Sequence, residues 1–235
     1  MEGGSDSSPT DQVNVIGNVF GSWHFILNYK KENYEIKAYH EHFFEDHSGV
    51  IFKNIPDGIY GVEFNLKRKF PISSILFEYI HTKNQSGPFL WDKTPEIPIQ
   101  VSADDNYYNH AEYISTSYYG FVLGNPLLTS PIYNNKETLN VRNSRIIAFH
   151  GGIGGYVTND LNYRALVTYS RSWGTPGKPS IHIKNQFSSL LELNYSNPKL
   201  TGWLFSGAFA YDDSATMVGD NTGFRMKISK TFHVK

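Results

Sequence analysis

Apolar and polar side chains alternate along most of the chain with a period of two residues. In the stretch SWHFILNYK, Phe25, Leu27 and Tyr29 alternate with mostly polar neighbours, and YGVEFNLK repeats the scheme through Val62 and Phe64. Successive side chains of a strand point to opposite faces of its sheet, so this period predicts strands rather than helices. The pattern recurs often enough to predict about nine or ten strands, the others lying near 33–44, 73–81, 145–157, 163–171, 187–195, 202–211 and 223–229.

The predicted strands are long. They run for about ten residues or more, whereas strands of soluble sandwiches usually have about five or six. About nine to eleven residues is the length of a tilted strand that crosses a bilayer. Tyrosines also lie at the ends of the apolar faces, where a transmembrane barrel carries its aromatic girdles. The pattern therefore favours an all-β fold, a transmembrane antiparallel β-barrel, over a soluble β protein.

The connections between these strands alternate in length. Tight turns are expected near 31–33, 67–71, 158–160 and 196–199, and longer loops at 45–58, 173–184 and 212–221. The strand before 83–143 follows a short turn and the strand after it precedes one, so 83–143 must contain an even number of crossings, zero included. We interpret 83–143 as one long extracellular or luminal excursion inserted in a single domain, 1–235. A loop of this length in a compact protein is usually functional.

Nine strands cannot close as a bacterial barrel, which has an even strand number. The start MEGGSDSSPTDQ is polar and lacks the basic and apolar regions of a secretory signal. We therefore expect part of a larger barrel, whose partners are outer-membrane lipid and an N-terminal remainder of the barrel.

The composition excludes several kinds of partner and binding site. The formal net charge of −1 offers no field for nucleic acid, and the absence of cysteine excludes disulfides and thiolate metal sites. The chain has 16 Tyr and 16 Phe although its mean hydropathy is −0.40. A transmembrane barrel combines these properties because polar residues alternate with its apolar ones. No apolar stretch is long enough for a spanning helix.

The stretch YHEHFFEDH, 39–47, resembles a metal site. Period two places His40 and His42 on one face and Glu41 and Phe43 on the other, so the candidate ligands do not converge. A catalytic zinc site needs about three protein ligands. We therefore expect a strand end that enters a polar loop, with no metal and no cofactor.

Seven stretches together are similar to the capsule assembly Wzi family, particularly its Bacteroides-type members. They occur in order along the chain: EHFFEDHSG, PDGIYGVE, EIPIQVSADDNYYNH, GNPLLTSPIYN, NSRIIAFHGGI, YSRSWGTP and NTGFRMKISK. The resemblance covers about the C-terminal half of a typical member. It implies an outer-membrane β-barrel that assembles or attaches capsular or other surface polysaccharide. It supplies no catalytic residues.

The segment 91–113 is the candidate glycan-contacting surface. Aromatic rings can stack on sugars while polar groups fix their orientation. The candidate residues are Trp91, Asp104, Asp105, Asn106, Tyr107, Tyr108, Asn109, His110, Tyr113 and, at the end of a later strand, Trp173. The alternative is a structural one, in which Asn and Asp cap turns and tyrosines pack the segment against the wall.

Two further functions stay open at this stage. A porin-like channel would use the charges of both signs expected on the luminal face, such as Glu63, Arg164 and Lys227. An envelope enzyme would use His110 with Asp104 or Asp105, but no convergent catalytic set is evident. The sequence therefore predicts a protein that is not an enzyme.

Overall fold

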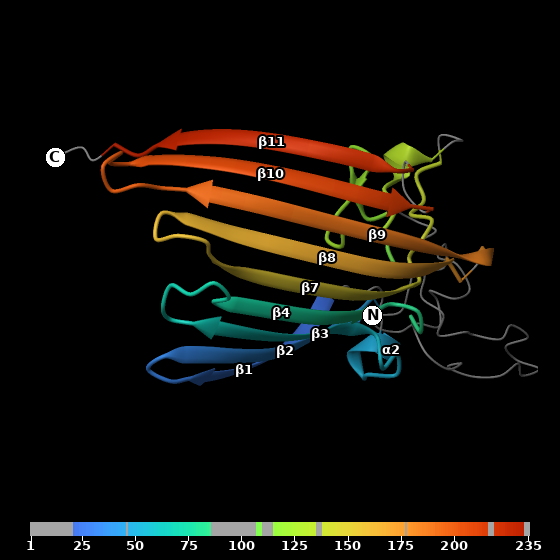
Figure 1. Ribbon diagram of the computed structural model, residues 1–235. Helices are drawn as coiled ribbons and strands as arrows, with labels where there is room; N and C mark the ends of the chain where they lie inside the picture. Colours follow the sequence, from blue (N-terminus) through green and yellow to red (C-terminus); the bar gives the residue numbers. More distant parts are fainter. Residues whose placement is uncertain are drawn as a thin grey trace, which may run out of the picture.

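The computed structural model describes residues 21–45, 47–85, 107–109, 115–134, 138–176, 178–215 and 219–232. Among them, nine strands form one antiparallel sheet (Figure 1), which confirms the predicted all-β class. No helix in these ranges is long and apolar enough to span a membrane. The strands of the sheet are β1 (Gly21–Lys30), β2 (Tyr34–Phe44), β3 (Gly58–Leu66), β4 (Ser74–His81), β7 (Ile146–Tyr156), β8 (Leu161–Gly174), β9 (Pro179–Tyr195), β10 (Trp203–Ser214) and β11 (Asn221–Lys230).

Each strand of this sheet pairs with the next strand of the same sheet along the chain, and the order is β1-β2-β3-β4-β7-β8-β9-β10-β11. β4 pairs directly with β7 in antiparallel register, with Tyr79 opposite Phe149. The described parts of 83–143 add no strand to this sheet. They contain the two-residue strands β5 (Ser117–Tyr118) and β6 (Phe121–Val122) and the short 3-10 helix η1 (Pro131–Tyr133).

Short turns gather at one end of the sheet and longer connections at the other, as Figure 1 shows. The segment from β2 to β3 contains the short helix α2 (His47–Val50). The prediction of a long loop at 173–184 is wrong, because β8 and β9 continue into it and leave only 175–178 between them. We call the two ends of the sheet the turn end and the loop end.

The register gives the sheet one apolar face. Residues directly opposite each other on paired strands share a face, and most of the large apolar side chains of the nine strands fall on the same one. No Asp, Glu, Lys or Arg occurs among its central positions. These positions are Phe25, Leu27, Tyr29, Ile36, Ala38, His40, Tyr60, Val62, Phe64, Ile75, Phe77, Tyr79, Phe149, Gly151, Ile153, Tyr163, Ala165, Val167, Tyr169, Phe187, Ser189, Leu191, Leu193, Phe205, Gly207, Phe209, Tyr211, Phe224, Met226 and Ile228.

In the described part of the structure, most of the large side chains of this apolar face remain exposed. Phe77 is 53% exposed, Val167 49% and Phe209 51%. In a soluble sandwich the apolar faces of two sheets pack against each other and bury such side chains. β1 and β11 are the edges of the sheet, and neither pairs with a further described strand. The described sheet is therefore open, and the predicted partial barrel and its membrane insertion stay predictions.

The opposite face, the polar face, carries the hydrophobic core at the loop end. Ile80 of β4 and Ile146 and Ala148 of β7 lie on this face and pack against Leu128 and Val141 of the following segments. The core is small, because most apolar side chains of the strands point the other way. It holds Val122, Leu127, Leu128 and Val141 against the polar face, beside the cavity described next.

Candidate functional site

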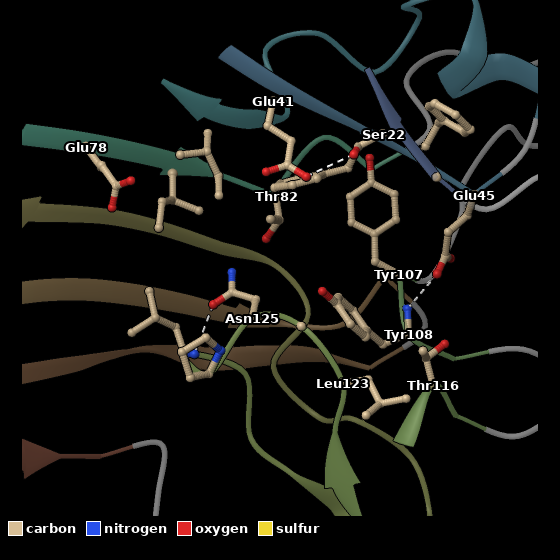
Figure 2. A pocket seen from close by; sticks show the side chains of 18 of the residues that line it. Ser22, Glu41, Glu45, Glu78, Thr82, Tyr107, Tyr108, Thr116, Leu123 and Asn125 are labelled. Atoms are coloured by element: carbon tan, nitrogen blue, oxygen red, sulfur yellow. Dashed lines mark hydrogen bonds between the residues drawn. The ribbon is translucent and has the colours of Figure 1, made fainter. Parts of the chain in front are cut away.

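A cavity of about 740 Å³ lies between the polar face at the loop end and the segment that packs on it (Figure 2). Strands β1, β2, β3, β4, β7 and β8 provide one wall, and Tyr107, Tyr108, Thr116 and residues 123–127 provide most of the other. Its lining residues are Gly21, Ser22, Glu41, Phe43, Phe44, Glu45, Ile59, Glu78, Ile80, Thr82, Tyr107, Tyr108, Thr116, Leu123, Gly124, Asn125, Pro126, Leu127, His150 and Thr168.

The strand wall carries the polar chemistry. Glu78, His150 and Thr168 occupy directly opposite positions on β4, β7 and β8, so the three side chains form a row across the sheet. His150 Nδ1 lies 2.7 Å from Thr168 Oγ1, and the Tyr39 hydroxyl donates to Glu78. Glu41 on β2 accepts a hydrogen bond of 2.9 Å from Ser22 Oγ. These contacts hold two carboxylates and an imidazole at the cavity surface.

Tyr108 forms part of the facing wall. Its backbone has a φ of 71°, a left-handed conformation that few residues other than glycine adopt, and its amide donates a 2.9 Å hydrogen bond to Glu45 Oε1. Figure 2 shows this bond beside the aromatic rings of Tyr107 and Tyr108. Burial raises the pKa of the Tyr108 hydroxyl, the Asn125 backbone lowers it, and Glu45 raises it further. The net direction is upward, so the hydroxyl stays protonated at neutral pH.

Tyr107 and Asn109 have structural contacts. The Tyr107 hydroxyl accepts from Asn54 Nδ2 at 2.6 Å and donates to the Gln85 carbonyl at 2.7 Å, and the residue is 3% exposed. Asn109 exchanges two hydrogen bonds of 2.7 Å with the backbone of Val141. Both side chains thus tie the segment to the rest of the molecule, which is the structural alternative considered for the DNYYNH stretch.

A buried carboxylate fixes the chain as it leaves β4. Asp57 accepts hydrogen bonds from the backbone amides of Asn84 and Gln85 and lies 2.7 Å from His81 Nδ1. The Gln85 side chain in turn donates to the carbonyls of Thr82 and Ser144. The start of the excursion is therefore anchored to residues just before β3 and just before β7.

His40 and His42 contact backbone carbonyls. His40 Nδ1 lies 3.1 Å from the Ile59 carbonyl, and the buried His42 ring lies between the carbonyls of Asp57 and Gly49. As the alternation predicts, Glu41 points to the other face, into the cavity. Within the described residues, no group of three or more His, Asp or Glu side chains could hold a metal ion.

The structure brings only part of the predicted glycan surface together. Tyr107 and Tyr108 border the cavity, Asn109 is buried nearby, and Trp173 lies on β8 at the loop end with Lys83 Nζ 4.4 Å from its ring centroid. Trp91, Asp104, Asp105, Asn106, His110 and Tyr113 lie outside the described residues.

Glu41, Glu78, His150 and Thr168 are not among the site residues predicted from the sequence. Each lies at a polar-face position of its strand. The alternation of apolar and polar residues therefore predicts which face of the sheet these side chains point to, but not which of them are neighbours. Their proximity depends on the pairing of β4 with β7 across 83–143, a separation of more than sixty residues in sequence for the pair Glu78 and His150. Knowledge of that pairing would have aligned the three side chains.

The cavity combines polar groups with an apolar surround. Two carboxylates, a hydroxyl, an imidazole and an amide can hydrogen-bond a ligand, and tyrosine and leucine side chains can cover its less polar faces. Ligand sites commonly combine a few placed polar groups with such walls. Comparisons with protein-family models, curated proteins and solved structures give no match for this chain. The resemblance to the Wzi family therefore stays a prediction.

Proposed function

We propose that this chain forms part of the wall of a bacterial outer-membrane β-barrel that binds surface polysaccharide and takes part in capsule assembly or attachment. The observation that carries the proposal is the exposed apolar face, which extends over all nine strands and has no charged residue at its central positions. Soluble monomers rarely expose apolar patches larger than a few hundred Å². Such a face is stable next to the acyl chains of a bilayer.

The energetics of the two faces support this orientation. Removal of apolar surface from water is worth roughly 25 cal/mol per Å², so leaving nine strands of it hydrated would be costly. A charged side chain at the bilayer midplane costs about 2–4 kcal/mol, and the central apolar positions contain none. The polar face carries charged pairs instead, including Glu192 with Arg225 at 2.8 Å and Arg164 at 3.5 Å.

The cavity is the proposed contact with glycan. It lies at the loop end, which in an outer-membrane barrel faces the cell exterior. Glu41, Glu78, His150 and Thr168 can hydrogen-bond sugar hydroxyls, and Tyr108 offers a ring beside them. Capsular polysaccharide is the hydroxyl-rich ligand that the cell surface provides, and the resemblance to the Wzi family supports the same class.

Binding of the purified, lipid-reconstituted chain to the producer's capsular polysaccharide tests this function. We expect Glu78→Gln to weaken binding about tenfold or more, because a hydrogen bond to a charged group is worth about 1.5–3 kcal/mol. Glu63→Gln is the matched control, since Glu63 lies on the polar face of β3 outside the cavity and contacts Asn65. No binding by the unaltered protein, together with normal capsule retention in a deletion strain, would reject the proposal.

A porin-like channel is the second candidate, supported by the mixed charges of the polar face. Planar-bilayer conductance separates the two functions. The segment packed on the polar face narrows the space beside the strands, so we expect a silent barrel rather than a stable open pore.

A further inference from the structure

Three cations gather on the apolar face at the loop end, and two of them lie over the ring of Trp173. We call this group the basic cluster: Lys83, Arg145, Arg171 and Trp173. Lys83 Nζ lies 4.4 Å and Arg171 Cζ 5.4 Å from the centroid of the Trp173 ring. Arg145 joins them because its Nε donates a 3.2 Å hydrogen bond to the Lys83 carbonyl and its own carbonyl accepts from the Trp173 amide.

The basic cluster lies just beyond a row of aromatic side chains. Tyr79, Phe149, Tyr169 and Phe187 occupy directly opposite positions on β4, β7, β8 and β9. Arg171 follows Tyr169 by two residues, and Lys83 and Arg145 lie four residues beyond the row. At about 3.3 Å per residue, the cations are roughly 7–13 Å from the row along the strands. If the aromatic row marks the membrane interface, the cluster is at headgroup depth.

No carboxylate in the described part of the chain pairs with these charges. None of the three cations forms an ion pair with an acidic side chain in the ranges that the structure describes. The carboxylate of Asp57 is buried and already receives His81 and two backbone amides. Asp213 shares the apolar face near the loop end, but β9 separates β10 from β8. The cluster therefore presents positive charge toward whatever covers this face.

We infer that the basic cluster binds the phosphate of an anionic lipid headgroup in the leaflet at the loop end. This inference rests on the proposed membrane placement. Arginine guanidinium groups bind phosphate through paired hydrogen bonds, and lysine adds a mobile charge. The apolar face directly below the cluster offers room for the acyl chains of the same molecule, which a free anion or a soluble polysaccharide does not require. Trp173 holds two of the cations over its ring and also contacts the interface.

Native mass spectrometry of the whole protein in neutral detergent, titrated with phosphatidylglycerol or phosphatidylcholine, tests the inference. We expect tighter retention of phosphatidylglycerol, and a loss of at least tenfold in the variant Lys83→Gln, Arg145→Gln, Arg171→Gln, since each cation near a membrane surface contributes about fivefold. The control variant Lys37→Gln, Lys184→Gln, Lys227→Gln removes the same charge from the polar face and should retain the lipid. Circular dichroism verifies that both variants are folded.

Equal affinity for the two lipids, or equal loss in both variants, would overturn the inference. Displacement of the lipid by millimolar inorganic phosphate would identify a site for free anions, and preferential retention of polygalacturonate would identify one for acidic polysaccharide. Either result also overturns it. Insertion into neutral vesicles is measured separately by protease protection. A chain that inserts but shows no lipid preference loses this inference alone, whereas a chain that fails to insert loses the membrane placement as well.

Discussion

At the scale of single residues, a few buried hydrogen bonds decide how the excursion packs on the sheet. Tyr107 links Asn54 of the β2–β3 connection to Gln85 after β4, and Asn109 links the same short segment to Val141. These bonds come from residues far apart in the sequence. Buried polar groups in proteins are nearly always paired, and losing one partner costs the desolvation of the other.

Replacing Tyr107 with Phe should lower the free energy of unfolding by about 1–3 kcal/mol, because the change leaves the Gln85 carbonyl and the Asn54 amide without that hydroxyl. Urea unfolding of the protein in lipid vesicles measures the change. Tyr119→Phe is the control, since Tyr119 is 82% exposed and should change stability little. Equal effects of the two substitutions would show that the Tyr107 hydroxyl does not anchor the segment.

The contacts of single residues were also the hardest features to predict from the sequence. The alternation correctly placed His40 and His42 on one face and Glu41 on the other, because the strand period fixes those directions. It could not show that Tyr107 is buried or that Glu78 and His150 are neighbours. Both depend on contacts between segments that local periodicity does not encode.

At the scale of elements, the strands could be predicted from the sequence, but the connections between them only in part. About nine or ten long antiparallel strands were expected, and the main sheet has nine. The parity of the short turns allowed an even number of crossings in 83–143, zero included, and the described parts of that segment add none to the main sheet. The β8–β9 hairpin is longer than expected because polar residues there still pair across the strands. Turn residues such as Gly and Pro do not by themselves end a hairpin whose strands continue to hydrogen-bond.

Gly155 is a position where an element requires glycine. A Cβ atom there would lie 1.9 Å from the Pro71 carbonyl oxygen, because the β3–β4 turn crosses the end of β7. We expect Gly155→Ala to destabilise the protein by at least 1–3 kcal/mol, the range typical of overpacking. Gly207→Ala is the control, since nothing lies within 4 Å of the added atom. Thermal or urea unfolding compares the two, and equal stabilities would contradict this account of the turn.

At the scale of the whole molecule, the sheet separates two environments. Its apolar face carries no charge at the central positions, and its polar face carries the ion pairs, the cavity and the small core. A soluble domain would bury the apolar face and expose the polar one. Here the apolar side chains are exposed instead. The proposed lipid-facing orientation would account for the small buried core in a chain rich in aromatic residues.

Two neighbouring leucines of β9 lie on opposite faces of the sheet, so the same substitution can be compared on the two faces. Leu191 is 47% exposed on the apolar face, and Leu190 lies on the polar face. In a bilayer, Leu191→Arg should cost about 2–4 kcal/mol of unfolding free energy. Leu190→Arg should cost clearly less, because its side chain can reach the charged groups and water of the polar face. If Leu190→Arg lowered the unfolding free energy in vesicles more than Leu191→Arg, the polar face rather than the apolar face would contact lipid, which would contradict this account.

Accessibility of single spin labels tests most directly whether the apolar face contacts lipid. The chain has no cysteine, so one labelled cysteine at a time can replace Leu190, Leu191, Glu192 and Leu193 in the vesicle-bound protein. We predict that labels at 191 and 193 collide with oxygen dissolved in the acyl chains, and that labels at 190 and 192 collide with a water-soluble nickel complex. Collision with the nickel complex at 191 and 193, or no alternation at all, would contradict the membrane placement and the functions proposed from it.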